Sequence, residues 1–183
     1  MVVNPRIKFT VHDYMATSDT ERYELIEGEL LVPPSPATEH QRIVVRLVLE
    51  LHNFVTQRGL GEVFVAPLDV VLSEHNVLQP DILFISNERM SIVTDRVRGA
   101  PDLVIEVLSP SSEARDRTLK ATVYARYGVR EYWLVDPTTH TVDVFTLGQR
   151  GFQRLGSYGS EDELESIVLP ELRLPLRRIF SSE

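Results

Sequence analysis

The sequence contains no cysteine, which excludes disulfide bonds, thiolate metal sites and cysteine nucleophiles. It also has no apolar run near the roughly 18 residues that a membrane-spanning helix needs. The N-terminal stretch from Met1 to Met15 lacks a long apolar core followed by a small-residue cleavage site. We therefore expect a cytoplasmic protein with no membrane partner.

Positive charge is scarce in this chain. It has 19 Lys and Arg residues against 27 Asp and Glu residues, a net charge of −8, which argues against a general high-affinity coat for nucleic acids. An enzyme that holds a polyanion locally is not excluded, because a metal ion and a few cationic side chains can supply the positive field. From their spacing, a solvated basic face is the commoner explanation for the candidate side chains. These are Arg89, Arg96, Arg98, Arg115, Arg117 and Lys120.

Length and periodicity outline the fold. With 183 residues, 43% of them hydrophobic, the chain suits one compact domain over residues 1–183. Apolar residues at helical spacing predict a helix over 38–57 ended by Gly59, and another over 113–127 ended by Gly128. In the second helix, Leu119, Val123 and Tyr127 form the expected apolar ridge. Strands are expected at 62–66, 68–72, 77–85, 103–108 and 129–137, with hairpins over 22–32 and 141–158.

Two of these strands carry a carboxylate that a purely structural strand would avoid. Glu106 lies in the run Leu103 to Leu108, and Asp81 follows Pro80 at the head of another apolar run. A buried ionised carboxylate is costly unless cations or donors meet it. For one acid, a satisfied core carboxylate or an arginine partner is an equally good explanation. Two such acids favour a functional site.

The spacing of the two acids lets them meet. A separation of 25 residues allows one strand, a polar connection and a return strand beside it. Because neighbouring strands lie about 4.8 Å apart, Asp81 and Glu106 at matching heights could share one divalent cation such as Mg²⁺. Lys120 would return along the following helix to a similar height, with its stem beside the apolar ridge. An exposed lysine is the alternative explanation.

Two further residues are weaker candidates. His40 falls in the first turn of the helix over 38–57, where a positive helix terminus favours a neutral, hydrogen-bonding or metal-adjacent imidazole, although a surface histidine is commoner. In the first hairpin, Tyr23, Leu25, Leu30 and Val32 are expected to face inward. Glu24 and Glu29 are then solvent-facing charges, with a modest chance that Glu29 lines the site.

The motifs together resemble a known family. Pro80-Asp81 followed by Ile105-Glu106-Val107 resembles the PD-(D/E)XK nuclease superfamily, with the lysine moved from position 108, which is leucine here, to the next helix. More narrowly, residues 9–180 resemble the Uma-two family of restriction-endonuclease-like proteins. The stretches that carry this resemblance are YELIEGEL, SPATEHQRIV, APLDVVLSEHNVLQPDILFI, PDLVIEVLSPSS, DRTLKATVYARYGVREYWLVDP and VLPELRLPL.

The resemblance implies an α/β restriction-endonuclease-like core, a mixed central sheet flanked by helices on both faces. It also implies a metal site of Asp81 and Glu106 with Lys120 as catalytic partner, and Glu29 and His40 as residues that line the cavity. On this basis we expect an endonuclease that hydrolyses DNA with Mg²⁺ or Mn²⁺ and acts as a homodimer. Two alternatives stay open: a catalytically inactive binding or assembly module, and a hydrolase of small phosphoesters.

Overall fold

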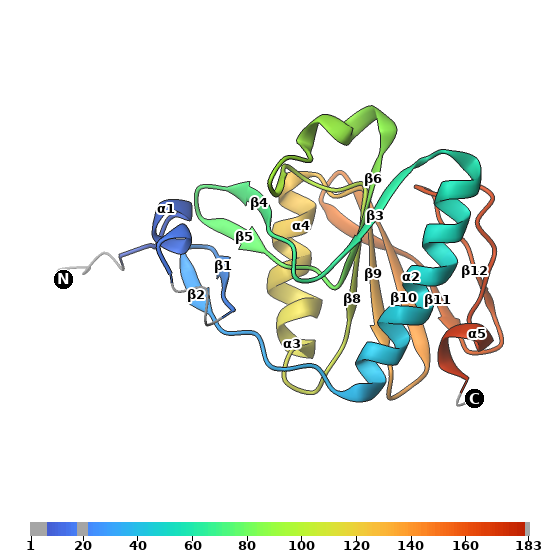
Figure 1. The fold of residues 1–183 in the computed structure, drawn as a ribbon. Helices are drawn as coiled ribbons and strands as arrows, with labels where there is room; N and C mark the ends of the chain where they lie inside the picture. Colours follow the sequence, from blue (N-terminus) through green and yellow to red (C-terminus); the bar gives the residue numbers. More distant parts are fainter. Residues whose placement is uncertain (1–6, 18–21, 182–183) are drawn as a thin grey trace.

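A larger sheet forms the centre of the computed structural model, which describes residues 7–17 and 22–181 (Figure 1). Its strand order is β11-β10-β9-β8-β6-β3. The β8 and β9 strands are parallel, whereas the other neighbours are antiparallel, so the sheet is mixed, as predicted. The strands are β3 Gly61–Val65, β6 Ile82–Ser86, β8 Leu103–Val107, β9 Glu131–Asp136, β10 Thr141–Gly148 and β11 Gly151–Gly159.

Helix α2, Thr38–Arg58, covers one face of this sheet (Figure 1). Its buried residues recur at helical spacing, and Gly59 ends the helix in the left-handed conformation with φ of 61°. Both the helix and its end are confirmed. The core on this side contains the α2 residues Ile43, Leu47, Leu51 and Val55. It also contains alternate residues of β6 and β8, which are Ile82, Phe84, Leu103, Ile105 and Val107.

A helical segment covers the opposite face, as predicted for residues 113–127. It consists of α3 Glu113–Arg115, the π-helical turn η2 Asp116–Lys120 and α4 Ala121–Tyr127, and Gly128 ends it with φ of 92°. The predicted ridge is partly wrong, because Leu119 is 36% exposed. The buried stripe is centred between Val123 and Tyr124, and Lys120 shares it while Leu119 falls at its edge.

A smaller sheet with strand order β2-β1-β5-β4-β7 lies beside the helical segment (Figure 1). The first hairpin turns at Glu27 and Gly28, as predicted, and β4 pairs antiparallel with β5, also as predicted. Val32, expected to face inward, is exposed because β2 ends at Leu31. The strands are β1 Glu24–Ile26, β2 Glu29–Leu31, β4 Val70–Ser73, β5 Asn76–Leu78 and β7 Val97–Arg98.

The predicted single strand over 77–85 is wrong. The chain belongs to the smaller sheet up to Leu78 and joins the larger sheet at Ile82, so the link Gln79–Asp81 carries it from one sheet to the other. Pro80 in the middle of the link has no N–H to donate to a ladder, which is a physical reason for the break. Asp81 therefore stands where the two sheets meet.

The remaining elements close the ends of the chain. Thr10 and Asp13 form a capping box at the start of α1 Val11–Met15. The C-terminal segment packs Leu169, Leu172 and Leu176 into the core on the α2 side. No helix in residues 7–17 and 22–181 is long and apolar enough to cross a membrane. The other short elements are the 3₁₀ helix η1 Asn87–Ile92, the strand pair β12 Glu163–Leu164 and β13 Leu174–Pro175, and α5 Arg177–Phe180.

Candidate active site

Asp81 immediately precedes β6, and Glu106 lies in the neighbouring strand β8 of the larger sheet. The β6 and β8 strands pair antiparallel with Ile82 opposite Ile105, so one step further along the same register sets Asp81 opposite Glu106. Both lie on the sheet face covered by the helical segment, because Leu83, Val104 and Leu108 contribute to the core there. The two acids also line one cavity of about 110 Å³. The expected adjacency of their strands is confirmed.

Each of these two carboxylates has one oxygen bound by protein donors. Asp81 Oδ2 accepts from the Val107 backbone N–H at 2.8 Å and lies 3.1 Å from His40 Nε2. Glu106 Oε1 accepts from the Tyr124 hydroxyl at 2.8 Å and from the Lys120 ammonium at 3.1 Å. Among the described residues, Asp81 Oδ1 and Glu106 Oε2 accept no hydrogen bond. One oxygen of each acid thus stays available to a ligand.

Lys120 lies at the centre of an acidic cluster. Its Nζ lies 3.0 Å from Glu24 Oε1, 3.1 Å from Glu106 Oε1 and 3.5 Å from Asp116 Oδ1. The side chain is only 7% exposed, so these contacts are not screened as surface ion pairs are. Although burial opposes its charge, the carboxylates of Glu106, Glu24 and Asp116 raise the pKa of Lys120 above its ordinary value. These three carboxylates therefore favour the charged form of the amine.

The carboxyl group of Glu106 is held in a costly environment. Burial raises the pKa of Glu106 well above its ordinary value, and the nearby carboxylates of Asp116, Asp81 and Glu24 raise it further, while Lys120 acts in the opposite direction. Burial likewise raises the pKa of Asp116, again against the effect of Lys120. Both carboxyl groups are therefore harder to ionise than exposed ones, and a cation bound beside them would favour their charged forms.

The sequence did not identify three members of the cluster. Glu24, expected to face solvent, is 1% exposed and accepts from the Gln79 backbone N–H at 2.9 Å. Strand β1 is buried on both faces, so the alternation rule failed there. One sequence signal was available for Asp116, which precedes Lys120 by four residues on one helix face. Tyr124 lies beside the predicted ridge, and its hydroxyl donates to Glu106 Oε1.

The two weaker candidates have different locations. His40 is buried, lines the cavity and contacts Asp81 from the first turn of α2. Glu29 is exposed on β2, opposite Ile26, and does not belong to the residues that line the cavity. Glu29 lies beside the turn on the edge strand β2, whereas Glu24 lies at the other end of the hairpin on the inner strand β1. The structure therefore brings His40 to the site and not Glu29.

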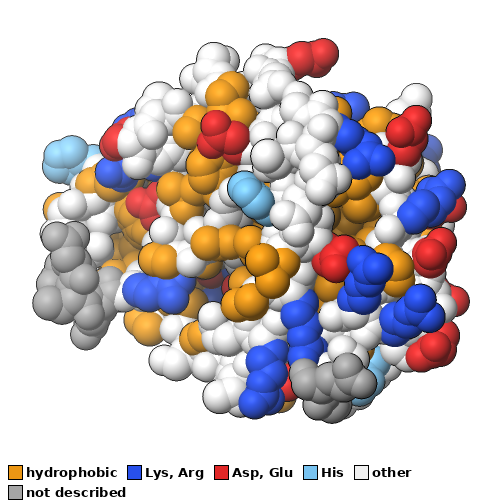
Figure 2. Space-filling view, turned by 45° about the vertical axis from the view of Figure 1, so that its right-hand side comes forward, with side chains coloured by type: hydrophobic (Ala, Val, Ile, Leu, Met, Phe, Trp, Pro, Cys, Tyr) orange, Lys and Arg blue, Asp and Glu red, His pale blue; other side chains and the backbone are white. Residues whose placement is uncertain are grey.

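Most of the candidate arginines form ion pairs elsewhere. Arg89 pairs with Asp102, Arg96 and Arg98 pair with Asp95, and Arg117 pairs with Glu113. Of the predicted group, Arg115 and Lys120 line the cavity, and Arg115 Nη1 lies 4.0 Å from Glu24 Oε2. On the face shown in Figure 2, basic side chains lie among acidic ones and do not form a continuous stripe.

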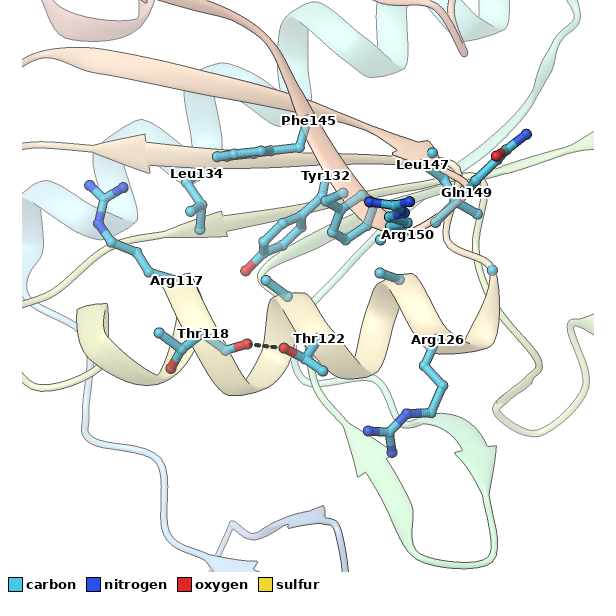
Figure 3. A pocket seen from close by; sticks show the side chains of 16 residues that line it. Arg117, Thr118, Thr122, Arg126, Tyr132, Leu134, Phe145, Leu147, Gln149 and Arg150 are labelled. Atoms are coloured by element: carbon cyan, nitrogen blue, oxygen red, sulfur yellow. Dashed lines mark hydrogen bonds between the residues drawn. The ribbon is translucent and has the colours of Figure 1, made fainter.

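A larger groove lies between α4 and the β10–β11 hairpin (Figure 3). Its volume is about 950 Å³, and its floor includes Tyr132, whose ring stacks on Phe152 at 5.4 Å. Figure 3 shows Tyr132 and Leu134 extending from the sheet toward the helical segment. The side chains that line this groove include arginines but no carboxylate. It therefore lacks the hard oxygen ligands of a Mg²⁺ site.

The smaller cavity has the right donor chemistry for one divalent cation. Asp81 and Glu106 offer two available carboxylate oxygens, and Mg²⁺ binds through one or two carboxylates, with waters and substrate phosphates as further ligands. Within residues 7–17 and 22–181, no three His, Asp or Glu side chains form a complete metal-binding group. The residues present fit a cation that is shared with substrate.

Comparison with known proteins identifies the family and the fold of the chain. Residues 11–177 match the family model Uma2, described as "Putative restriction endonuclease". The chain is 28% identical over 165 residues to "Uncharacterized protein slr1290" of Synechocystis sp. (strain ATCC 27184 / PCC 6803 / Kazusa), a match that covers 88% of this chain and 86% of that protein.

The structure also resembles a solved one, "Crystal structure of a putative nuclease belonging to DUF820 from Anabaena variabilis ATCC 29413". The TM-score is 0.81 and the identity 22%, over 94% of this chain and 97% of that chain. The likeness confirms the predicted restriction-endonuclease-like α/β fold, with a mixed sheet and helices on both faces.

Proposed function

Because the chain belongs to the Uma2 family, we propose that it is a metal-dependent endonuclease that hydrolyses phosphodiester bonds in DNA. The family model is described as "Putative restriction endonuclease", and the similar Anabaena protein as "a putative nuclease". The observation that carries the proposal is that Asp81, just before β6, and Glu106, on the paired strand β8, line one cavity.

Asp81 and Glu106 would hold a Mg²⁺ or Mn²⁺ ion. When bound, this ion supplies Lewis-acid polarisation of the scissile phosphate and acidifies a water. His40 fixes Asp81 through its Nε2 contact, and Tyr124 fixes Glu106 through its hydroxyl. These contacts leave the same oxygen of each carboxylate available in every turnover, which is the role of residues that support metal ligands.

Lys120 contributes positive charge beside the reacting phosphate. The ammonium orients the attacking water or stabilises the negative charge that develops on the phosphate oxygens. Its longest contact, 3.5 Å to Asp116, is the one that a water or a phosphate oxygen would replace. Cleavage of both strands of a duplex needs two such sites, so the single domain over residues 1–183 would act as a homodimer.

Cation-dependent nicking of supercoiled plasmid tests the proposal. The wild type is compared with Asp81→Ala and Lys120→Ala, and Glu88→Ala serves as control because Glu88 is exposed on η1 outside the cavity. We expect nicking in Mg²⁺ or Mn²⁺ that is lost in the two site variants and retained in Glu88→Ala. Equal activity in all four proteins would refute the assignment.

The net charge of −8 favours a second candidate function, a catalytically inactive binding or assembly module. Calorimetric titration with Mn²⁺ separates the two. Binding that is lost in Glu106→Ala supports the enzyme, whereas no binding near neutral pH supports the module. Turnover of a chromogenic phosphodiester without any DNA cleavage would instead indicate a hydrolase of small phosphoesters.

A further inference from the structure

The Lys120 ammonium is surrounded in the way that a bound cation is. Three carboxylates contact it, from β1 (Glu24), β8 (Glu106) and η2 (Asp116). An ammonium has three N–H donors, and the three acids lie 3.0 to 3.5 Å from its nitrogen. The π-helical turn Asp116–Lys120 supplies both the amine and one of the acids, and single π turns often occur at functional sites.

Two oxygens of this cluster lack a hydrogen-bond donor among the described residues. Glu24 Oε2 and Asp116 Oδ1 are buried and accept no hydrogen bond from any described residue, although Lys120 lies 3.5 Å from the second and Arg115 lies 4.0 Å from the first. Buried carboxylate oxygens are costly without a donor or a cation. Both side chains line the same cavity as Asp81 and Glu106. Additional positive charge at this position would therefore stabilise the two oxygens.

We propose that the Lys120 ammonium takes the place of a second divalent cation, so that the wild-type site binds one ion and not two. The inference rests on the proposed function for the first ion, held by Asp81 and Glu106. Glu24, Glu106 and Asp116 are then ligands of an ammonium. Removal of the lysine side chain converts them into a second site for a hard cation such as Mn²⁺.

The electrostatics of the cavity explain why the two cations exclude each other. Glu106 contacts the ammonium through Oε1, and its Oε2 is the oxygen available to the first ion. A second ion on Oε1 would lie within a few ångströms of the ammonium, where repulsion between like charges in a buried site is strong. The acids that would offset this repulsion already contact Lys120.

The number of bound Mn²⁺ ions tests the inference without any measurement of cleavage. Calorimetry and the loss of the free Mn²⁺ signal in electron paramagnetic resonance both count ions per chain. We expect one ion in wild type, two in Lys120→Ala and one in the triple variant Lys120→Ala, Glu24→Gln, Asp116→Asn, which removes two carboxylate ligands at nearly constant volume. Two ions in wild type, one in Lys120→Ala or two in the triple variant would each overturn the inference.

The design separates this inference from the proposed function. If wild type and Lys120→Ala each bind one ion, only the inference is overturned. If wild type binds one ion and Lys120→Ala binds two, but wild type does not cleave DNA, only the proposed endonuclease function is overturned. No ion in wild type overturns both. Lys120→Ser provides a second uncharged variant if Lys120→Ala does not fold, as judged by circular dichroism, and the wild-type count needs no variant.

Discussion

The hydroxyl of Tyr124 donates to Glu106 Oε1 over 2.8 Å, the same oxygen that the Lys120 ammonium contacts at 3.1 Å. Both donors come from one buried stripe of the helical segment. The helix therefore holds Glu106 by one oxygen and leaves the other without a protein donor. This relation makes the orientation of Glu106 depend on the packing of a helix, and not only on its own strand.

Tyr124→Phe removes one of the two donors and keeps the ring. We expect Mn²⁺ affinity to fall roughly 10-fold, the lower end of the range for residues that support a metal ligand, and the free energy of unfolding to change by about 1 kcal/mol. Isothermal titration and chemical denaturation measure the two effects. Tyr127→Phe is the matched control, because the Tyr127 hydroxyl accepts a bond from Asn76. Equal Mn²⁺ affinity in the two variants would contradict the supporting role of Tyr124.

His40→Ala removes the imidazole that lies 3.1 Å from Asp81 Oδ2. Asp81 then keeps only the Val107 N–H as a donor on that oxygen and is free to rotate, so we expect Mn²⁺ to bind roughly 10-fold more weakly. His52→Ala, on an exposed position of the same helix, should bind as the wild type does. The prediction fails if titration gives the same dissociation constant for both histidine variants.

Glu106→Gln should change the pH dependence of stability. Burial, and then the neighbouring carboxylates, raise the pKa of Glu106 well above its ordinary 4.5 in the folded state. Above pH 4.5 the folded protein therefore retains a proton that the unfolded chain loses, and the free energy of unfolding falls as pH rises toward the folded-state pKa. The glutamine variant lacks this loss.

Without divalent cations, Glu106→Gln should thus gain stability relative to wild type as pH rises from 4 to 8. Denaturation with urea at several pH values measures the difference between the two proteins, which removes the contribution of other groups such as Asp116. A variant that loses stability relative to wild type over this range would show that the Lys120 ion pair outweighs the burial of Glu106.

A pair of leucines on α2 tests the assignment of its buried face. Leu47 is fully buried and Leu49 is 57% exposed. We expect Leu47→Ala to lower the free energy of unfolding by about 2 to 5 kcal/mol because it leaves a cavity in the core, and Leu49→Ala to change it by less than about 0.5 kcal/mol. Denaturant titrations measure both. Similar losses would mean that Leu49 is covered in solution.

Long periodic segments and chemical anomalies were predictable from the sequence. Helix α2 shows its period over many residues, and Glu106 and Asp81 stand out because apolar strands seldom contain acids. Lys120 followed from the geometry of a strand, a turn and a returning helix. Glu24 did not, because a strand of three residues buried on both faces has no readable alternation. The change of sheet at residues 79–81 also depends on tertiary pairing that no local pattern encodes.

The link between the two sheets is anchored to the cavity at both ends. The Gln79 N–H donates to Glu24, and Asp81 accepts from the Val107 N–H. An extra residue after Asp81 would turn its carboxylate to the opposite face of the sheet, since side chains alternate along a strand. Insertions are therefore incompatible with this short crossing, whereas the hairpin tip at Gln149 and Arg150 would accept them without effect on the acids. Homologues that keep the acids should differ in length at the tip and not at the crossing.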